Sequence, residues 1–444
     1  MAIDFKLKDF CHPLPILRLR RFLERSQWAD EADLERYQGD RLRATVRHAY
    51  ARVPYYRALF DRLGLRPEDI DGPRDLGALP VLSREDLRVR GHQLMATDLW
   101  RHRPVRYRTT GTTGEPATVY LDKHTNVLEF CYYWRYWSWG GYRLGRPFAE
   151  LGVHAFLGAD PRAEMRYTPW TRKLDLNAAR LGGVAVVEFA GALRKHRVAF
   201  LKGPPSGLHV FALLLERARL EVALEAVFTA GETLLPHQRQ AIERAFHCRV
   251  LDSYGHMERT VGISQCPDGG YHVNPEYGVL EVEKIDRLST DSLTVGTIVG
   301  TSLHNRAMPL LRYRTGDLIE LRPGRPRCRC GRSLPLCERV LGRTQDVLVT
   351  RDGRYVTNAF VVFHGVPGVA WFQIVQHERD RFEIRVQAEE AFTAAEEDKV
   401  KASLGRLLGP ARIAVRRVTA AARERLAGPK YRSVVSHVDK DLPG

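Results

Sequence analysis

A short run of hydroxyl-bearing residues and glycines in this chain could hold phosphate. The run is TTGTTGEP, at residues 109–116, between two segments expected to be strands. Glycines let the backbone approach a ligand closely, and backbone N–H groups with threonine hydroxyls can bind phosphate oxygens. The run is not the P-loop of nucleoside triphosphatases, because no Gly-Lys-Ser/Thr follows it. Taken alone, it is equally compatible with a Thr/Gly-rich hairpin turn.

Two other segments could bind a metal. SQCPDGGYH supplies Cys266 and His272, and CRC supplies Cys328 and Cys330. Two sulfur or nitrogen ligands on each of two segments suit tetrahedral zinc, although the spacing is not the usual Cys-x2-Cys. Four protein ligands would leave no open position, so this zinc would be structural. Buried free thiols are the alternative, and Cys337 could substitute as a ligand.

Five more segments carry polar residues that suit nucleotide chemistry. They are AGETL (230–234), DSYGHMERT (252–260), LLRYRTGD (310–317), LGRTQD (341–346) and GPKYRSV (428–434). With the phosphate-type run, their order and spacing resemble the adenylate-forming superfamily of acyl-CoA synthetases, adenylation domains and luciferases. The chain is most similar there to the phenylacetate–CoA ligase family and its capsule-biosynthesis relatives, which also match VPYYRALFDRLGL and CRCGRSLP. The resemblance covers about residues 45 to 436.

The resemblance implies a role for each matching residue. The residues that would cradle the β- and γ-phosphates of ATP are Thr109, Thr110, Gly111, Thr112, Thr113 and Gly114. The residues that would line the nucleotide site are Gly231, Glu232, Ser253, Tyr254 and Gly255, with the Tyr254 ring beside adenine. Glu258 would hold Mg²⁺, a hard cation that bridges carboxylate and phosphate oxygens. Asp317 would accept hydrogen bonds from both ribose hydroxyls.

Three residues near the carboxyl end complete this set. Arg343 would contact ribose or phosphate, Gln345 stands at the interdomain hinge, and Lys430 would bridge the substrate carboxylate and the α-phosphate. Two positions depart from the family pattern. Glu115 replaces a usual lysine and so puts a negative charge near the polyphosphate, and Pro429 replaces a common glycine and stiffens the approach of Lys430.

The segment FCYYWRYWSWGGYRLG (130–145) is unusually rich in aromatic residues. At helical spacing Tyr133 and Trp137 fall near one face, and packing in the core is the alternative reading for most of these rings. The resemblance places this helix beside the acyl pocket. We therefore expect Tyr133 and Trp137, with Phe228 and His256, to line that pocket.

The implied reaction joins an acid, ATP and a thiol. The acid carboxylate attacks the α-phosphorus, pyrophosphate leaves, and a thiol then attacks the acyl-AMP, so catalysis is chiefly positioning and electrostatics. The implied cofactors are ATP, Mg²⁺, CoA or a phosphopantetheine, and structural zinc, with an aryl acid as substrate. A carrier protein or an amine as acceptor, a catalytically inactive nucleotide-binding protein, and a homodimer stay open.

The helices and strands that we expect to position these residues indicate an α/β protein. Residues 31–70 read as helices, and from about 105 to 300 strands alternate with helices, with VAVVEFA (184–190) read as a strand. Residues 270–322 predict a β-subdomain on the same body. We expect a multi-layer adenylation domain at 1–344, with a helical lead-in over about 1–100. A small mobile α+β domain is expected at 345–444.

The overall composition bears on which other classes of protein the chain could belong to. The 444 residues have 44% hydrophobic content, a mean hydropathy of -0.33 and a net charge of +16. The basic residues are mixed with acids along the chain, which favours attraction of anionic nucleotides over specific nucleic-acid binding. No apolar stretch of about 18 residues predicts a membrane span, and the first residues read as mature sequence. Seven cysteines, an odd number, favour a reducing cytoplasm over a disulfide framework.

Overall fold

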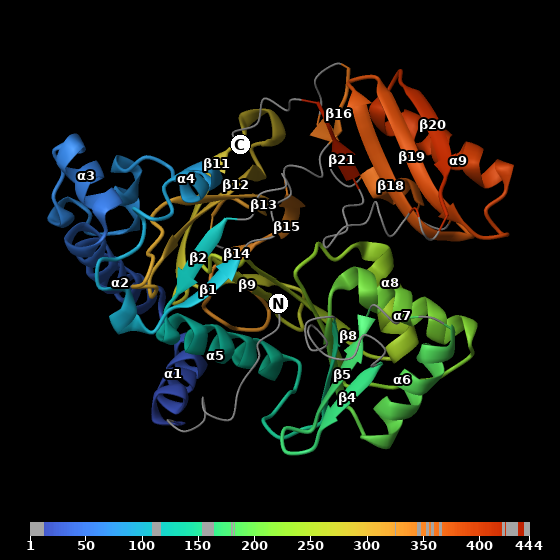
Figure 1. The fold of residues 1–444 in the computed structure, drawn as a ribbon, viewed down its shortest axis with the longest axis horizontal. Coiled ribbons are helices and arrows are strands. Elements are labelled where there is room, and N and C mark those ends of the chain that lie inside the picture. The colour runs from blue at the N-terminus through green and yellow to red at the C-terminus, as the bar shows by residue number, and fades with distance from the viewer. Residues whose placement is uncertain are drawn as a thin grey trace.

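A computed structural model describes most of the chain. The described residues are 13–108, 117–152, 164–178, 181, 183–324, 326–343, 348–351, 355–356, 359–363, 366–419, 422 and 434–438. They form a mixed α/β protein with sheets of nine, four and four strands and two two-stranded hairpins. Figure 1 shows the N-terminal helices on one side of the view and the C-terminal sheet, in orange and red, apart from the rest.

Helices and short turns begin the chain, as expected. They are α1 (Pro13–Ser26), α2 (Glu31–Arg52), α3 (Pro54–Leu63), η2 (Pro67–Asp69), η3 (Pro73–Ala78), α4 (Arg84–Val89) and η4 (Leu99–His102). A capping box is present at the start of α4. The hydroxyl of Ser83 accepts from the N–H of Asp86 at 3.0 Å, and the Asp86 carboxylate accepts from the N–H of Ser83 at 3.0 Å.

A nine-stranded sheet forms the centre of the body. Its spatial order is β14 (Leu336–Cys337), β10 (Tyr271–Val273), β9 (Gly262–Gln265), β8 (Arg249–Gly255), β7 (Ala226–Ala230), β6 (Phe200–Gly203), β3 (Phe148–Gly152), β5 (Lys173–Asn177) and β4 (Met165–Thr168). The five strands from β8 to β5 are parallel, and the strands at both ends are antiparallel.

Helices cover both faces of this sheet because its side chains alternate. Val227 of β7 packs with α6 (Gly183–Lys195), α7 (Pro205–Arg217) and α8 (Pro236–Phe246). Phe228, the next residue, packs on the opposite face with α5 (Lys123–Trp139) and α1. The parallel strands are therefore buried on both sides, as the predicted α/β class requires.

The strand predicted for residues 184–190 is wrong, because these residues lie in helix α6. Their valines favour strands, yet the buried residues recur at helical spacing. These residues are Ala185, Val186, Phe189, Ala190 and Leu193. Packing of that face against the sheet and α7 outweighs the weak local preference of valine for strands.

A second, four-stranded antiparallel sheet adjoins the first. It contains β11 (Gly278–Lys284), β12 (Thr294–Ser302), β13 (Tyr313–Leu321) and β15 (Arg339–Arg343), with η7 (Asp286–Leu288) in the first connection. This is the predicted β-subdomain, although β10 belongs to the large sheet. The hairpin of β1 (Val105–Arg108) and β2 (Thr118–Leu121) shares a core with α2, α3 and residues 303–313.

The C-terminal elements form their own sheet and core. The elements are β16 (Leu348–Val349), β17 (Tyr355–Val356), η9 (Ala359–Phe363), β18 (Val369–Glu378), β19 (Arg381–Ala388), α9 (Ala394–Leu408), β20 (Arg412–Arg417) and β21 (Val434–Ser436). The elements β18, β19, α9 and β20 follow one another as β-β-α-β, and β21 lies parallel to β18. Among the described residues, their core is built from side chains of 348–434. The predicted domain boundary falls at 344–347, outside the described residues. In the described part of the chain no helix is long and apolar enough to cross a membrane.

Candidate nucleotide and metal sites

The nucleotide motifs follow two neighbouring parallel strands at their carboxyl ends. Gly231 and Glu232 come directly after β7, and Gly255 ends β8; the two strands are paired in register from Ala226 to Ala230. Ligands of open α/β sheets bind in the crevice beyond the carboxyl ends of the strands. The topology therefore brings the AGETL and DSYGHMERT motifs to one edge of the large sheet.

Ser253 and Gly255 hold the end of β8 in place. The buried Ser253 hydroxyl donates to the carbonyl of Thr229 on β7 at 3.0 Å. A Cβ atom at Gly255 would lie 3.4 Å from the hydroxyl of Tyr133 on α5, which is an ordinary van der Waals contact. The Ser253 hydroxyl thus connects the ends of β8 and β7, and Gly255 lies beside Tyr133.

Tyr254 and Asp317 are joined directly. The Tyr254 hydroxyl donates to Oδ2 of Asp317 at 2.7 Å, and Asp317 is buried on β13. Burial and the nearby carboxylate of Asp317 raise the pKa of Tyr254 well above its ordinary value, so the phenol keeps its proton and remains a donor. On the neighbouring strand β15, Arg343 pairs with Asp317 through the backbone register. The Asp317 carboxylate of the four-stranded sheet is therefore hydrogen-bonded to Tyr254 of the nine-stranded sheet.

Glu258 is a buried, ionised carboxylate three residues beyond β8. Tyr313 donates to its Oε1 at 2.8 Å, and the Nδ1 atom of His256 lies 3.1 Å from its Oε2. Burial alone would raise the pKa of Glu258, but the bonds from His256 and Tyr313 outweigh burial and lower that pKa to about 2. The site therefore carries a fixed negative charge at neutral pH.

The hydrogen bonds of His256 define which of its ring nitrogens carries the proton. The N–H of Val261 points at Nε2 of His256 at 3.3 Å, and the hydroxyl of Thr260 lies 3.1 Å from the same atom. Because a backbone N–H can only donate, Nε2 accepts and the proton lies on Nδ1, from which it is donated to Glu258. His256 was expected to line the acyl pocket; in the structure both of its ring nitrogens are used to position Glu258 and the following turn.

Glu232 and Gly342 connect the AGETL motif to its surroundings. The Glu232 carboxylate accepts from the backbone N–H of Ser206, in the first turn of α7, at 3.0 Å. A carboxylate is stabilised there by the unpaired N–H groups of the helix start. A side chain at Gly342, whose φ is +96°, would begin 2.6 Å from the hydroxyl of Thr233. The end of β15 thus lies against the AGETL segment.

The three remaining pocket residues are packed in one aromatic group. Trp137 lies 5.9 Å from Tyr133 and 6.5 Å from Phe228, measured between ring centroids, and all three side chains are buried. Lys202, at the carboxyl end of β6, places its ammonium 5.5 Å from the centre of the Trp137 ring. The three rings form part of the core beneath the β8 edge, and their expected place beside an acyl pocket stays a prediction.

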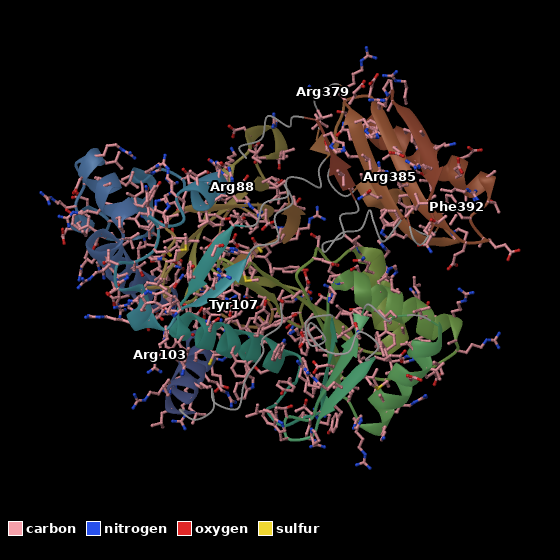
Figure 2. All side chains as sticks on the ribbon, viewed as in Figure 1. Arg88, Arg103, Tyr107, Arg379, Arg385 and Phe392 are labelled. Atoms are coloured by element: carbon pink, nitrogen blue, oxygen red, sulfur yellow. The ribbon has the colours of Figure 1, made fainter. Side chains whose placement is uncertain are left out.

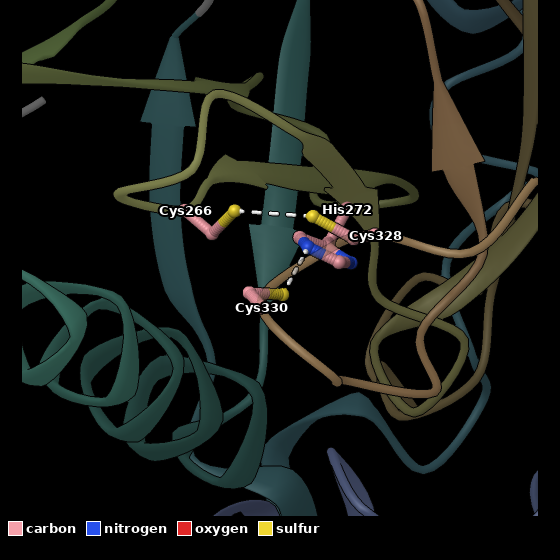
Figure 3. Close-up of side chains that lie close together, drawn as sticks. All are labelled: Cys266, His272, Cys328 and Cys330. Carbon is pink, nitrogen blue, oxygen red and sulfur yellow. Dashed lines mark hydrogen bonds between the residues drawn. The ribbon is translucent and has the colours of Figure 1, made fainter.

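Four predicted zinc ligands also converge (Figure 3). The sulfur atoms of Cys266 and Cys328 are 3.5 Å apart, and Cys330 Sγ lies 3.2 Å from His272 Nε2. The four ligand atoms all lie within 4.8 Å of one another. Pairing of β10 with β14 causes this convergence, because it brings the chain around residues 328–337 beside His272.

The surroundings of this cluster suit a metal. The His272 Nδ1 atom lies 3.1 Å from the carbonyl of Leu334, which fixes its proton there and leaves Nε2 facing Cys330. Burial lowers the pKa of His272 to about 4, so its imidazole is neutral at neutral pH, as a metal ligand must be. A side chain at Gly270 would begin 2.7 Å from Cys328 Sγ, so only glycine fits there. Cys337, the suggested substitute, lies apart in the core with Val261 and Ile263.

Several predicted residues cannot be placed. The phosphate-type run 109–116, including Glu115, lies outside the described residues, as do Gln345, Pro429 and Lys430. The backbone of Arg343 is described and its side chain is not. These assignments stay predictions.

The structure also reveals residues that sequence reasoning missed. Tyr107, on β1 just before the phosphate-type run, donates to Asn126 of α5 at 2.9 Å. The buried Arg259 donates to the same Asn126 oxygen and lies over the Tyr107 ring. These contacts connect the hairpin of β1 and β2 to Arg259, the residue after Glu258. Tyr313 lies inside the LLRYRTGD motif, so its role could have been suspected; Tyr107 and Asn126 carry no such signal.

Sequence comparison finds no matching family model, but it does find relatives. The phenylacetate–CoA ligase of Thermus thermophilus is 28% identical over 390 residues, which cover 81% of this chain and 82% of that protein. The phenylacetate–CoA ligase of Pseudomonas putida is 27% identical over 75% of each chain. Protein CapK of Staphylococcus aureus is 22% identical over 73% of this chain and 71% of that protein.

Solved structures share the fold. A 2-hydroxyisobutyryl-CoA ligase in its postadenylation state, bound to an acyl adenylate, has a TM-score of 0.68 at 18% identity, over 89% of this chain and 88% of that one. The same ligase with CoA in the thioesterification state has a TM-score of 0.58 at 20% identity, over 93% and 91%. The fold is therefore that of the adenylate-forming CoA ligases. The sequence adds that the chain is an enzyme similar to the phenylacetate–CoA ligases.

Proposed function

We propose that this enzyme activates an aryl carboxylic acid with ATP as its acyl-AMP and transfers the acyl group to the thiol of CoA. The observation that carries the proposal is the convergence of Tyr254, Asp317 and Glu258 at the joint of the two sheets, in a chain with this fold. The sequence relatives that are phenylacetate–CoA ligases support an aryl acid and CoA.

Each of these residues has a part in the adenylation step. Asp317 accepts hydrogen bonds from the ribose hydroxyls, and Tyr254 holds that carboxylate in place while its ring borders the adenine. The run 109–114 and Lys430 bind the phosphates, and Lys430 also holds the attacking carboxylate. These contacts fix the phosphate oxygens of the bound ATP. The entropy cost of orienting the reactants is therefore met on binding, before the carboxylate attacks the α-phosphorus.

Glu258 fits the part of a Mg²⁺ ligand. It is ionised, and each of its oxygens accepts one side-chain hydrogen bond, which leaves a lone pair on each for a cation. The ion would neutralise charge on the phosphates. His256 and Tyr313 keep the carboxylate in one orientation, so they are positioning residues.

The aromatic group of Tyr133, Trp137 and Phe228 supports an aryl acid because flat rings offer stacking and edge contacts to another ring. The cluster of Cys266, His272, Cys328 and Cys330 would hold one structural zinc. That zinc would fix the loop after the DSYGHMERT segment to the chain after RTGD. We place the enzyme in the cytoplasm, where these thiols stay reduced.

The second candidate function differs only in the acceptor. Because formation of the acyl-AMP is the same half-reaction in both cases, transfer to a carrier-protein phosphopantetheine or an amine in a biosynthetic pathway is the alternative to transfer to CoA. A screen for pyrophosphate release over aryl and alkyl acids, each with and without CoA, separates the candidates. Release with an aryl acid, followed by a CoA thioester, is the expected result. Adenylation without thioester formation would exclude CoA as the acceptor, and no release with any acid would contradict the adenylation proposal.

A further inference from the structure

A second cluster of metal-ligand side chains lies away from the cysteines. It consists of His48 in the middle of α2, Asp98 just before η4, and His102 at the end of η4. One ligand atom from each of the three lies within 4.8 Å of the others. All three side chains are half-buried, so the cluster is shielded and still reachable by an ion.

Two atoms of this cluster face each other without a hydrogen bond. Oδ1 of Asp98 and Nε2 of His102 are 3.4 Å apart, and both atoms are buried. Within the described part of the chain neither atom has a hydrogen-bond partner. Buried polar atoms of native proteins are nearly always paired, so each such pair needs an explanation. A cation between the two would satisfy both lone pairs.

The other contacts of the cluster leave room for that cation. The Nε2 atom of His48 lies 2.8 Å from the carbonyl of Arg306, and because a carbonyl only accepts, this nitrogen carries the ring proton. The Nδ1 atom of His48 is then unprotonated and able to bind a metal. Arg52 approaches the second oxygen of Asp98, Oδ2, at 3.9 Å, so the carboxylate can keep one oxygen for the arginine and one for the ion.

We propose that His48, Asp98 and His102 bind a divalent transition-metal ion such as zinc. Two imidazoles and one carboxylate are a common zinc ligand set, and three protein ligands leave a position for water. The site differs from the cysteine cluster in having no sulfur ligand and an open coordination position. It is therefore expected to bind metal more weakly and to exchange it with solvent.

The position of this site suggests what the ion does. The N–H of Thr97 donates to the carbonyl of Arg52 at 2.8 Å, and the N–H of Ala96 donates to the carbonyl of Ala307 at 3.0 Å. The chain before η4 is therefore already hydrogen-bonded to α2 and to the 304–308 segment. After His102 the backbone turns at Arg103, whose φ is +49°, and enters β1, which leads into the phosphate-type run. Figure 2 labels Arg103 and Tyr107 on this stretch. A bound ion would tie the base of that hairpin to α2.

Cobalt titration of the full chain tests the proposal, because Co²⁺ reports sulfur ligands by a charge-transfer band that nitrogen and oxygen ligands do not give. After removal of resident metal, wild type is expected to bind two equivalents of cobalt. His102→Ala and Asp98→Asn should each lose one equivalent and keep the full sulfur-to-cobalt band. Asp98→Asn preserves the shape of the side chain, so it remains informative if His102→Ala folds poorly.

The matched control is His196→Ala, which replaces a half-buried histidine that stacks on Tyr167 and is not part of either cluster. It should bind two equivalents, and added cobalt should raise the thermal midpoint of wild type and this control more than that of Asp98→Asn. Equal cobalt binding by wild type and both cluster variants would overturn the proposal. A single equivalent in wild type, accompanied by the full sulfur band, would overturn it as well.

Discussion

The hydroxyl of Tyr254 lies 2.7 Å from Oδ2 of Asp317, which joins the last residues of β8 to β13 across 63 positions of sequence. This bond spans the joint between the nine-stranded and the four-stranded sheet. It places the ring expected beside adenine and the carboxylate expected on ribose within one hydrogen bond of each other. Nucleoside recognition would therefore depend on both sheets holding their relative positions.

Replacing Asp317 with alanine should weaken ATP binding strongly. Each hydrogen bond from a ribose hydroxyl to the carboxylate contributes about 1.5–3 kcal/mol, so the loss should be at least roughly tenfold in affinity. The measurement is the ATP dependence of pyrophosphate release, with Asp286→Ala as the control. Asp286 is an exposed acid of η7 whose loss should change nothing. Near-normal ATP affinity in Asp317→Ala would remove this residue from the site.

Replacing Lys430 with alanine should separate the two half-reactions. Because the lysine neutralises charge only while pyrophosphate departs, acyl-AMP formation should fall far more than thioester formation from ready-made acyl-AMP. Rapid-quench assays of each half-reaction make the comparison. Lys440→Ala, ten residues further along the chain, serves as the control and should retain both rates. Equal losses in both half-reactions of Lys430→Ala would point to a different lysine or to misfolding.

Glu150 should make the stability of the large sheet depend on acidity. Burial alone would raise its pKa, but Lys202 at 2.9 Å and Lys173 at 2.8 Å outweigh burial and lower the pKa to about 2. A folded-state pKa below the unfolded value means that the stabilisation is complete above about pH 4.5 and is lost as the pH falls toward 2. The contribution at neutral pH is about 3 kcal/mol.

Urea unfolding of Glu150→Gln at several pH values measures this effect. Wild type should be more stable than the variant at pH 7, and the difference should shrink between pH 4.5 and pH 3. Glu225→Gln removes an exposed partner of Arg146 and should cost no more than about 1 kcal/mol at any pH. A wild-type advantage over Glu150→Gln that is the same at pH 7 and pH 3 would contradict the assignment.

Replacing Cys328 with serine should remove the tightly held zinc and lower the thermal midpoint together. The four ligands leave no open position, so the ion supports the fold and does not activate water. Elemental analysis after dialysis against a weak chelator should find about one zinc per wild-type chain. Cys337→Ala, which deletes a buried thiol outside the cluster, should lose stability but keep its zinc. Metal-free wild-type protein with reactive thiols at these positions would refute the site.

Local sequence was enough for most elements and for the chemistry of the motifs. The cap of Ser83 and Asp86 joins residues three positions apart, and the strands beside the phosphate-type run and the helix and strands after residue 369 follow from local patterns of residue type. Residues 184–190 show the limit of that reasoning. Their valines favour a strand locally, and only burial against the sheet and α7 selects a helix.

Which distant residues meet was decided by the tertiary structure. The sequence names Cys266, His272, Cys328 and Cys330 as ligand types, but their convergence depends on the pairing of β10 with β14. It names His256 as a pocket residue, whereas the turn at Thr260 and Val261 directs both ring nitrogens into bonds that position Glu258. Residue type and spacing are local properties, while strand register and side-chain direction are settled only when sheets and helices pack together, because each buried polar group must then find its partner.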